Sequence, residues 1–372
     1  MIPRIYPSDE TDFDNLGIGA LGDAISCVVT MERNMPPTLE MEYPVTGKRY
    51  EDLVEERIIY CRAEYGGSNQ IFRIYSITKP LNGVVTVKAE HIAYYLAKVV
   101  IPPCGLGQNA TPALVWDKIV TLGYPQDIGF TFTTDIVSTM QSGWITQVPI
   151  TALDALAGSS GSIIDIWGYG DYTFNNKAIT LSADGGRDNG FSVTYGKNLT
   201  GVEMTSDMTN VYTGVLPFWN VEYRDGAQIL SSNPVIYSSH VNDYVNPMIM
   251  IKDFTSYYDR DKDTATNEAN IRQAATDYVN HGLNDSLIAN LKVDFVALGQ
   301  FGQYSEYEQL RDVKLYDTVK VYYPLMGINV KTKVVKTQYD VLIDRYASIE
   351  LGEQEVSLVN VISQIAKRSA RK

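Results

Sequence analysis

Alternating apolar and polar positions between residues 58 and 92 predict an antiparallel sheet with one buried face. The segments IIYCRAEY (58–65), IFRIYSI (71–77) and VVTVKAEHI (84–92) each have the length and residue types of a strand. The intervening PLNG, residues 80–83, is typical of a tight turn. In the last segment Val85, Val87 and Ala89 share one face, so we expect them in a core.

Helical periodicity appears in the middle of the chain. Residues 111–123 run from a capping Thr111 to a terminating Gly123, and residues 151–158 predict a second, short helix. Residues 266–282 predict an amphipathic helix inserted between β segments. The positions expected to face inward are Val115, Ile119 and Leu122 in the first helix, and Ile271, Ala274, Ala275 and Tyr278 in the inserted one.

Short apolar runs separated by turn residues continue towards the C-terminus. Residues 158–201 contain SIIDIWGY, YTF and AITLS, which we interpret as brief strands of a small β domain. Residues 292–352 predict further strands, with a hairpin around residues 324–327. Residues 353–372 predict a helix whose apolar stripe is buried either by copies around a symmetry axis or by its own domain. The stripe consists of Leu358, Ile362 and Ile365.

Composition supports a folded, β-rich chain of two or three domains. The 372 residues are 45% hydrophobic and 20% charged, and they include 26 Tyr, a residue favoured in strands and at contact surfaces. The net charge of -13 argues against sequence-independent nucleic-acid binding, which depends on Lys and Arg. The fold class expected is therefore α+β, rich in β structure.

Cysteine usage and the N-terminal sequence restrict the compartment. Cys27, Cys61 and Cys104 are an odd number without CxxC spacing, so we expect buried thiols and neither a disulfide framework nor a zinc site. The N-terminal MIPRIYPSDETDF lacks the apolar stretch of a secretory signal, and no run of about 18 apolar residues occurs. We expect synthesis in the cytoplasm without a membrane anchor.

Residues 17–22, GIGALG, match the GxGxxG pattern of dinucleotide-binding loops. In those loops a buried strand precedes the glycines and a helix follows them. Here the preceding YPSDETDFDNL is polar and the following AISCVVTMER is β-branched. The sequence therefore predicts a glycine-rich turn and no bound cofactor.

Asp259, Asp261 and Asp263 have the one-three-five spacing of a calcium loop. The loop also needs glycine at its sixth position and a bidentate glutamate at its twelfth, whereas this chain has Thr264 and Asn270 there. We interpret the three aspartates as a solvated acidic turn and assign no metal ligand.

The three histidines do not belong to a recognisable catalytic motif. His91 and His281 fit a strand–helix junction and a helix C-terminus, and neither these nor His240 lies in HExxH. There is also no GxSxG motif, and nothing selects a catalytic pair among the 44 acidic residues. We therefore assign no catalytic residue and expect a protein that is not an enzyme.

The tryptophans leave two interpretations open. Aromatic faces at the surface can stack on sugars, while core packing explains the same residues equally well. The residues concerned are Trp144, Trp167 and Trp219.

Several segments, taken in order, resemble a known family. They are residues 17–34, MEYPVTG (41–47), QIFRI (70–74), AEHIAYYL (89–96), DIWGYGDYTFN (165–175), GFSVTYGKNLTG (190–201), LYDTVKV (315–321) and IELG (349–352). Together they resemble the tail-hub family of long-tailed phages of Gram-positive hosts, which includes prophage endopeptidase tail and tail-associated lysin proteins. The resemblance covers nearly the whole chain.

The resemblance implies a fold similar to the central hub of contractile-tail baseplates, with two tube-like β-barrel domains in each subunit of a homotrimer. We expect the first at residues 1–100 and the second at 191–235 plus 292–352. Peripheral α/β structure would occupy 101–190 with a helical insertion at 236–291, followed by the helix at 353–372. In this arrangement Lys197 lies at the entry to the second tube domain and is not an anion ligand.

The resemblance also implies a function at the tip of the tail in the virion. A trimer would close the tail tube, contact the distal tail ring, the tape measure protein and a receptor-binding protein, and open for DNA ejection. Long members of the family continue into lytic or fibre domains, whereas this sequence stops twenty residues after IELG. The alternatives left open are a tail-associated peptidoglycan hydrolase and a receptor- or carbohydrate-binding tip protein.

Overall fold

The computed structural model describes most of the 372 residues. The described residues are 2–79, 81–107, 109–139, 143–158, 161–194, 199–207, 209–221, 226–281, 283, 285, 287–295, 312–323, 328–352 and 355–356.

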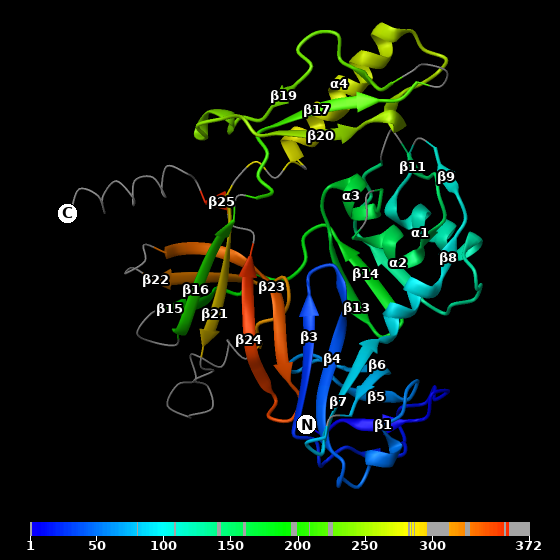
Figure 1. The fold of residues 1–372 in the computed structure, drawn as a ribbon, viewed down its shortest axis with the longest axis vertical. Helices are drawn as coiled ribbons and strands as arrows, with labels where there is room; N and C mark the ends of the chain where they lie inside the picture. The colour runs from blue at the N-terminus through cyan, green and yellow to red at the C-terminus, as the bar shows by residue number, and fades with distance from the viewer. Residues whose placement is uncertain are drawn as a thin grey trace, which may run out of the picture.

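A β region at the N-terminus, here called the first β region, is built from seven strands around one apolar core (Figure 1). Leu39, Met41, Val85 and Val87 are all buried there, which confirms the alternation read from the sequence. The strands are β1 (Arg4–Tyr6), β2 (Gly19–Ala20), β3 (Ser26–Glu32), β4 (Met35–Pro44), β5 (Ile58–Arg62), β6 (Asn69–Thr78) and β7 (Val84–His91), with 3-10 helices η1 (Tyr50–Asp52) and η2 (Ile92–Lys98).

A second β region is assembled from strands that are distant in the sequence. Its strands are β15 (Phe191–Thr194), β16 (Leu199–Asp207), β21 (Leu287–Phe295), β22 (Thr318–Tyr323), β23 (Ile328–Asp340), β24 (Arg345–Gly352) and β25 (Glu355–Val356). β22 and β23 are antiparallel, as the predicted hairpin requires, although residues 324–327 lie outside the described part. β15 pairs with β22 in parallel.

Within the described residues, the two β regions form one continuous 14-stranded sheet. The connection is the antiparallel pairing of β3 with the last part of β23, in which Glu32 lies opposite Lys336 and Val28 opposite Asp340. Met31 and Tyr346 pack against the apolar cores of both regions. Backbone pairing and shared packing therefore hold the two regions in a fixed relation.

An α/β unit lies beside the sheet (Figure 1) and is built around a large apolar core of its own. Its elements are β8 (Val100–Ile101), β9 (Cys104–Leu106), α1 (Pro112–Leu122), β10 (Thr131–Thr134), β11 (Trp144–Thr146), β12 (Ile150–Thr151), α2 (Ala152–Leu156), α3 (Ile163–Trp167), β13 (Asp171–Asn175) and β14 (Ala178–Ser182). Thr111 caps α1, and Gly123 ends it, as predicted. Thr151 likewise caps α2.

A fourth part, the helix-capped unit, packs one long helix on a small sheet. It comprises β17 (Gly214–Trp219), β18 (Gln228–Ile229), β19 (Ile236–Tyr237), η3 (Val241–Asp243), β20 (Ile249–Asp253), η4 (Thr255–Tyr257) and α4 (Thr264–His281). Ile271 and Ala275 of α4 are fully buried, and Ala274 and Tyr278 pack beside them, which confirms the predicted inward face.

Three sequence-based expectations are wrong. Residues 163–167, expected as a strand, form α3, because Ser162 accepts a hydrogen bond from the Asp165 N–H at its start and Gly168 adopts φ 76° at its end. Residues 355–356, expected in a helix, form β25, which pairs with β21. Cys104 is only partly buried, unlike Cys27 and Cys61.

The rest of the predicted helix 353–372 lies outside the described residues. The fold is β-rich with few helices, as expected. The domain boundaries stay a prediction. The predicted boundaries place β17 in the second tube-like domain and α4 in the helical insertion, whereas residues of both elements pack in the core of the helix-capped unit.

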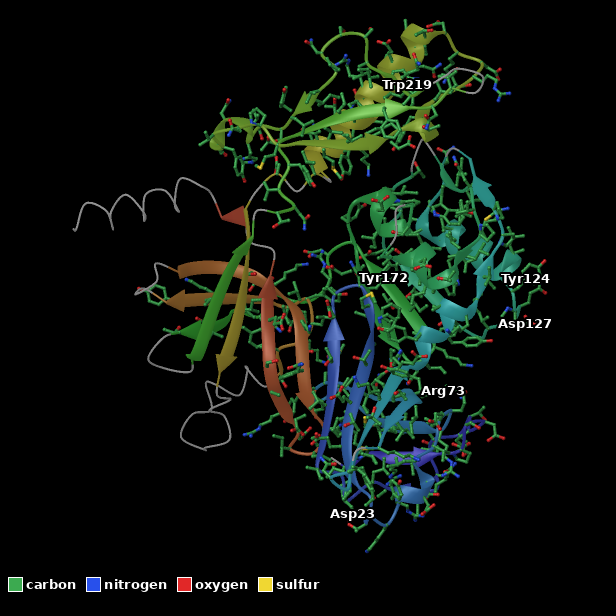
Figure 2. All side chains as sticks on the ribbon, in the orientation of Figure 1. Asp23, Arg73, Tyr124, Asp127, Tyr172 and Trp219 are labelled. Atoms are coloured by element: carbon green, nitrogen blue, oxygen red, sulfur yellow. The ribbon has the colours of Figure 1, made fainter. Side chains whose placement is uncertain are left out.

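The tryptophans lie in apolar cores. Trp144, Trp167 and Trp219 are at most 4% exposed, and Figure 2 places Trp219 within the helix-capped unit. The Nε1 atoms of Trp144 and Trp167 donate hydrogen bonds to the backbone oxygens of Gly161 and Ser138. Rings buried in this way offer no face to a sugar, so the core interpretation is confirmed.

Candidate functional site

The glycine motif at residues 17–22 forms a turn beside β1. Gly17 has φ 61°, and a Cβ atom there would lie 2.6 Å from the backbone oxygen of Ile5. The next long element is the strand β3, where a dinucleotide-binding loop would have a helix. Gly17 therefore serves a close backbone contact with β1.

The acidic turn before α4 is occupied by local hydrogen bonds. Oδ1 of Asp263 accepts from the N–H of Thr266 at 2.8 Å, and Oδ1 of Asp259 accepts from that of Asp261 at 3.0 Å. These bonds lower the pKa of Asp263 and of Asp259. Among the described residues, no group of three or more His, Cys, Asp or Glu side chains is placed to hold a metal ion.

His91 ends β7 and begins η2, at the strand–helix junction expected for it. The ring is fully buried, Nε2 lies 3.1 Å from Oε1 of Gln70, and Nδ1 accepts from the N–H of Ala93. Burial lowers the pKa of His91 to about 3, so the ring is neutral. His240 bonds to Asp243 at an exposed position, and His281 is the last residue of α4.

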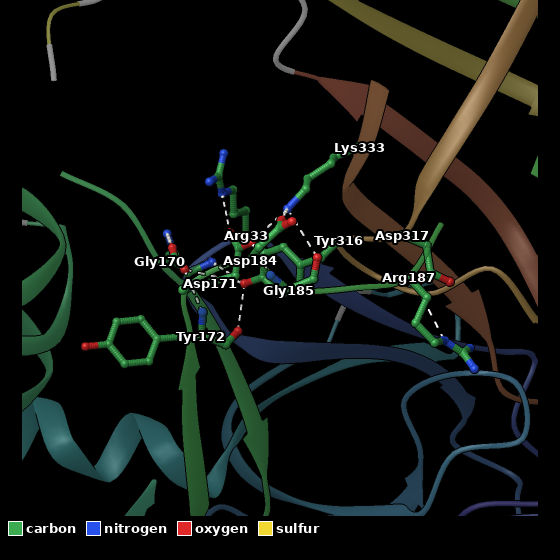
Figure 3. Close-up of polar contacts among 12 residues, drawn as sticks. Arg33, Gly170, Asp171, Tyr172, Asp184, Gly185, Arg187, Tyr316, Asp317 and Lys333 are labelled. Atoms are coloured by element: carbon green, nitrogen blue, oxygen red, sulfur yellow. Dashed lines mark hydrogen bonds and ion pairs between the residues drawn. The ribbon is translucent and has the colours of Figure 1, made fainter. Parts of the chain in front are cut away.

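A cluster of polar side chains lies where the α/β unit meets both β regions, and we call these residues the three-way junction (Figure 3). Its centre is Asp171 at the start of β13, only 2% exposed. One carboxylate oxygen lies 3.0 Å from Nε of Arg33, and the other lies 3.1 Å from Nζ of Lys333 and accepts from the N–H of Gly185 at 2.8 Å. Each cation comes from a different β region.

Lys333 also pairs with Asp184 and donates to the backbone oxygen of Gly185. Burial alone would lower the pKa of Lys333, but the carboxylates of Asp184 and Asp171 outweigh it and raise that pKa. The ammonium group is therefore charged at neutral pH and compensates the buried carboxylate of Asp171.

Asn34 and Tyr316 tie backbone groups across the same junction. The hydroxyl of Tyr316 donates to the backbone oxygen of Tyr172 at 2.7 Å and accepts from the N–H of Asn34 at 2.9 Å. The side chain of Asn34 accepts from the N–H of Tyr172 at 2.8 Å and donates to the backbone oxygen of Gly170 at 3.2 Å. Burial raises the pKa of Tyr316, so its proton stays available for donation.

Asp317 extends the junction towards residue 187. Its buried carboxylate accepts from the N–H groups of Arg187 at 2.8 Å and Lys314 at 3.0 Å, and the backbone oxygen of Arg187 accepts from the N–H of Thr318. The segment that leaves β14 is thereby aligned with β22 before β15 begins.

A second contact, the Asn176 contact, joins the α/β unit to the first β region. Oδ1 of Asn176 accepts from the N–H of Ile71 at 2.8 Å, and its own N–H donates to Oε1 of Gln70 at 2.8 Å. The amide of Gln70 also donates to Oδ1 of Asn175 at 3.0 Å. Since Oε1 of Gln70 also faces His91, this contact reaches the core of the first β region.

Sequence reasoning assigned no role to these residues. Residues 17–34 and the segments QIFRI, DIWGYGDYTFN and LYDTVKV contain these polar residues: Arg33, Asn34, Gln70, Asp171, Asn175, Tyr316 and Asp317. An isolated acid or amide gives no signal of a partner more than 100 residues away. The only available signal was that these polar residues lie at the ends of otherwise apolar strands. Lys197 lies outside the described residues.

The junction side chains neutralise one another and satisfy backbone groups. Such an arrangement holds three parts of one chain in a fixed geometry. In the part of the chain that the structure describes, no helix is both long and apolar enough to cross a membrane.

Comparison with known proteins identifies relatives of this fold. Residues 187–362 match the model of a family described as Prophage endopeptidase tail. No curated protein sequence matches the chain.

Three crystal structures of tail proteins share its fold. Prophage tail protein gp18 from Listeria monocytogenes EGD-e has a TM-score of 0.58 at 15% identity, covering 99% of both chains. The tail protein from Neisseria meningitidis MC58 has a TM-score of 0.55 at 9% sequence identity, and the match covers 96% of this chain and 98% of that chain. The 43 kDa tail protein of prophage MuSo2 from Shewanella oneidensis has a TM-score of 0.53 at 11% sequence identity, and the match covers 88% of this chain and 93% of that chain.

Proposed function

We propose that this chain, whose residues 187–362 match the Prophage endopeptidase tail family, is the structural hub at the tip of a long-tailed phage tail. In this proposal three copies form a ring that closes the tail tube and docks on the distal tail ring. The ring opens to let the tape measure protein and DNA leave. Each copy contributes two tube-like β domains, so that a threefold ring presents six similar domains to a sixfold partner.

The observation that carries this proposal is the continuous sheet. The two β regions are joined through β3 and β23, and the three-way junction fixes the α/β unit against both. A hub must transmit force between tube and tip without changing shape within a subunit. One sheet, reinforced by a buried ionic centre, has the stiffness that this task requires.

The charge of the chain supports the proposed passage of DNA. With a net charge of -13, it lacks the excess of Lys and Arg that would retard a polyanion. On the sheet face opposite the core, Lys88 lies 3.4 Å from Glu40 and Lys336 lies 3.5 Å from Glu32, so these cations are paired.

The proposal includes the absence of catalysis, in contrast to the word endopeptidase in the family description. The polar groups gathered at the junction are bonded to one another. A zymogram on cell walls of the host species would test the rival function of a peptidoglycan hydrolase. If the wild-type chain clears the cell-wall substrate and an Asp171→Asn variant still does so, the result would favour the hydrolase function and would place the active site outside the three-way junction.

The mass and symmetry of the purified protein test the hub function. We expect a native mass of about 125 kDa, three times 41.5 kDa, for the chain alone, or three copies of the chain in its complex with the distal tail ring, and threefold averages in electron microscopy. A monomer in both conditions would refute the trimer. A trimer that does not bind the ring would refute the adaptor role alone.

A further inference from the structure

A pocket lies between the two β regions, apart from the ionic centre at Asp171. Its volume is about 520 Å³, a size that in proteins holds small-molecule ligands. Three stretches of the chain line it: the loop between β5 and β6, the segment that leads into β15 and the segment that leads to β22. The side chains in its wall are those of Tyr65, Arg187, Asn189, Phe191, Asp312 and Lys314. The three stretches are distant in the sequence, so only the fold brings them together.

Two aromatic rings give the pocket a fixed apolar wall. Tyr65 packs against the core of the first β region, and Phe191 is buried in the core of the second. Rings held by a core lose little conformational freedom when a ligand contacts them. They can therefore pack against the C–H groups of a bound molecule at low entropic cost.

The two cations of the pocket already have carboxylates close to them. Nζ of Lys314 lies 2.6 Å from Oε1 of Glu64, and Nε of Arg187 lies 3.9 Å from Oδ1 of Asp317. Figure 3 shows the second pair to one side of Asp171. With Asp312, two formal positive charges stand against three negative ones, a sum of -1. The pocket thus does not favour an anion.

A cation is not favoured either, because the side chain of Arg187 stays 57% exposed and carries its charge into the pocket. The remaining polar groups lie at exposed positions, the amide of Asn189 and the carboxylate of Asp312. A guanidinium only donates hydrogen bonds, a carboxylate only accepts them, and an amide does both. A ligand that satisfies all three needs closely spaced groups that each donate and accept, as hydroxyl groups do.

We propose that this pocket binds a neutral saccharide. The hydroxyl groups of a sugar match the three polar side chains, and the C–H groups of its ring match the wall formed by Tyr65 and Phe191. A neutral peptide also has donors and acceptors, but an extended peptide is bound mainly by backbone groups along a strand edge. Here the polar groups are side chains from separate stretches, which suits a compact ring better.

Saturation-transfer NMR on the full-length chain tests the proposal. The probes are glucose, galactose, rhamnose and N-acetylglucosamine, each in large molar excess over the protein. We expect transfer of saturation to at least one of these sugars. In a double variant, Asn189→Ala with Asp312→Ala, the dissociation constant of that sugar should rise at least about tenfold, because two hydrogen-bonding groups are lost. No transfer to any of the four sugars, or an unchanged dissociation constant, would overturn the proposal.

Matched controls separate the pocket from nonspecific contact. Both replaced side chains are exposed, so the double variant should keep the Tm of the wild type. Asp261→Ala, at an exposed aspartate before α4, should leave the transfer unchanged, and an equal loss there would overturn the proposal. N-acetyl-trialanine amide and inorganic phosphate are tested in the same way. Tighter binding of either one than of any sugar, lost in the double variant, would also overturn it. The test does not depend on the trimer or on the hub function.

Discussion

Nε of Arg33 lies 3.0 Å from the carboxylate of Asp171, although 138 positions separate the two residues in the chain. Arg33 follows β3, the strand that joins the two β regions, and Asp171 opens β13 of the α/β unit. The other carboxylate oxygen lies against Lys333 of β23. One buried acid thus meets cations from both β regions, and this contact makes the relative position of three parts of the chain sensitive to single substitutions.

Replacing Asp171 with Asn should destabilise the chain strongly. The amide keeps the shape but leaves two cations facing a neutral group, and loss of one partner of a buried ionic network costs about 3 kcal/mol. The free energy of unfolding from urea titration measures the change. Asp188→Asn, which breaks the exposed pair with Lys331, should cost less than about 1 kcal/mol. Equal losses would contradict a special role for the junction.

Tyr316→Phe should also be destabilising, because its hydroxyl joins two backbone groups. Without it the N–H of Asn34 and the backbone oxygen of Tyr172 each lose a partner in a buried setting, at about 1–3 kcal/mol for each group. Hydrogen exchange at the Asn34 amide should increase. Tyr75→Phe, at a ring that is 52% exposed, serves as the control and should be neutral.

His91 should make stability depend on pH. Its folded pKa of about 3 lies below the ordinary value of 6.5, so the unfolded chain binds the proton more readily. The stability contributed by the neutral ring is fully present above pH 6.5 and is lost as the pH falls towards 3. The loss at pH 5 relative to pH 7 is about 2 kcal/mol.

The comparison between wild type and His91→Gln isolates this effect. The variant loses some packing at every pH, but its free energy of unfolding should change less between pH 7 and pH 5. Parallel pH profiles for the two proteins would show that His91 does not carry the dependence.

The three cysteines should differ in reactivity. Cys27 and Cys61 are buried in the first β region, where burial raises the pKa of Cys61, whereas Cys104 is only partly buried beside Thr146. Iodoacetamide should modify Cys104 in the folded protein and all three in denaturant, as peptide mass mapping can measure. Early labelling of Cys61 would contradict the buried core.

The sequence by itself determined the local elements. Thr111 and Gly123 set the ends of α1, the spacing of Ile271 and Ala275 gave the buried side of α4, and alternation gave β7, since capping and periodicity act within a few residues. The sequence-based prediction of a strand at α3 is wrong, because the helix caps Ser162 and Gly168 favour a helix more than the β-branched residues between them favour a strand.

Only the tertiary structure decided what the polar residues at strand ends do. Asp171 meets Lys333 across 162 positions, and β3 meets β23 across about 300, so neither pairing leaves a periodic trace in the sequence. Whether a buried carboxylate is stable depends on which cations the fold brings to it. The sequence supplied the charges, and the continuous sheet brought them together.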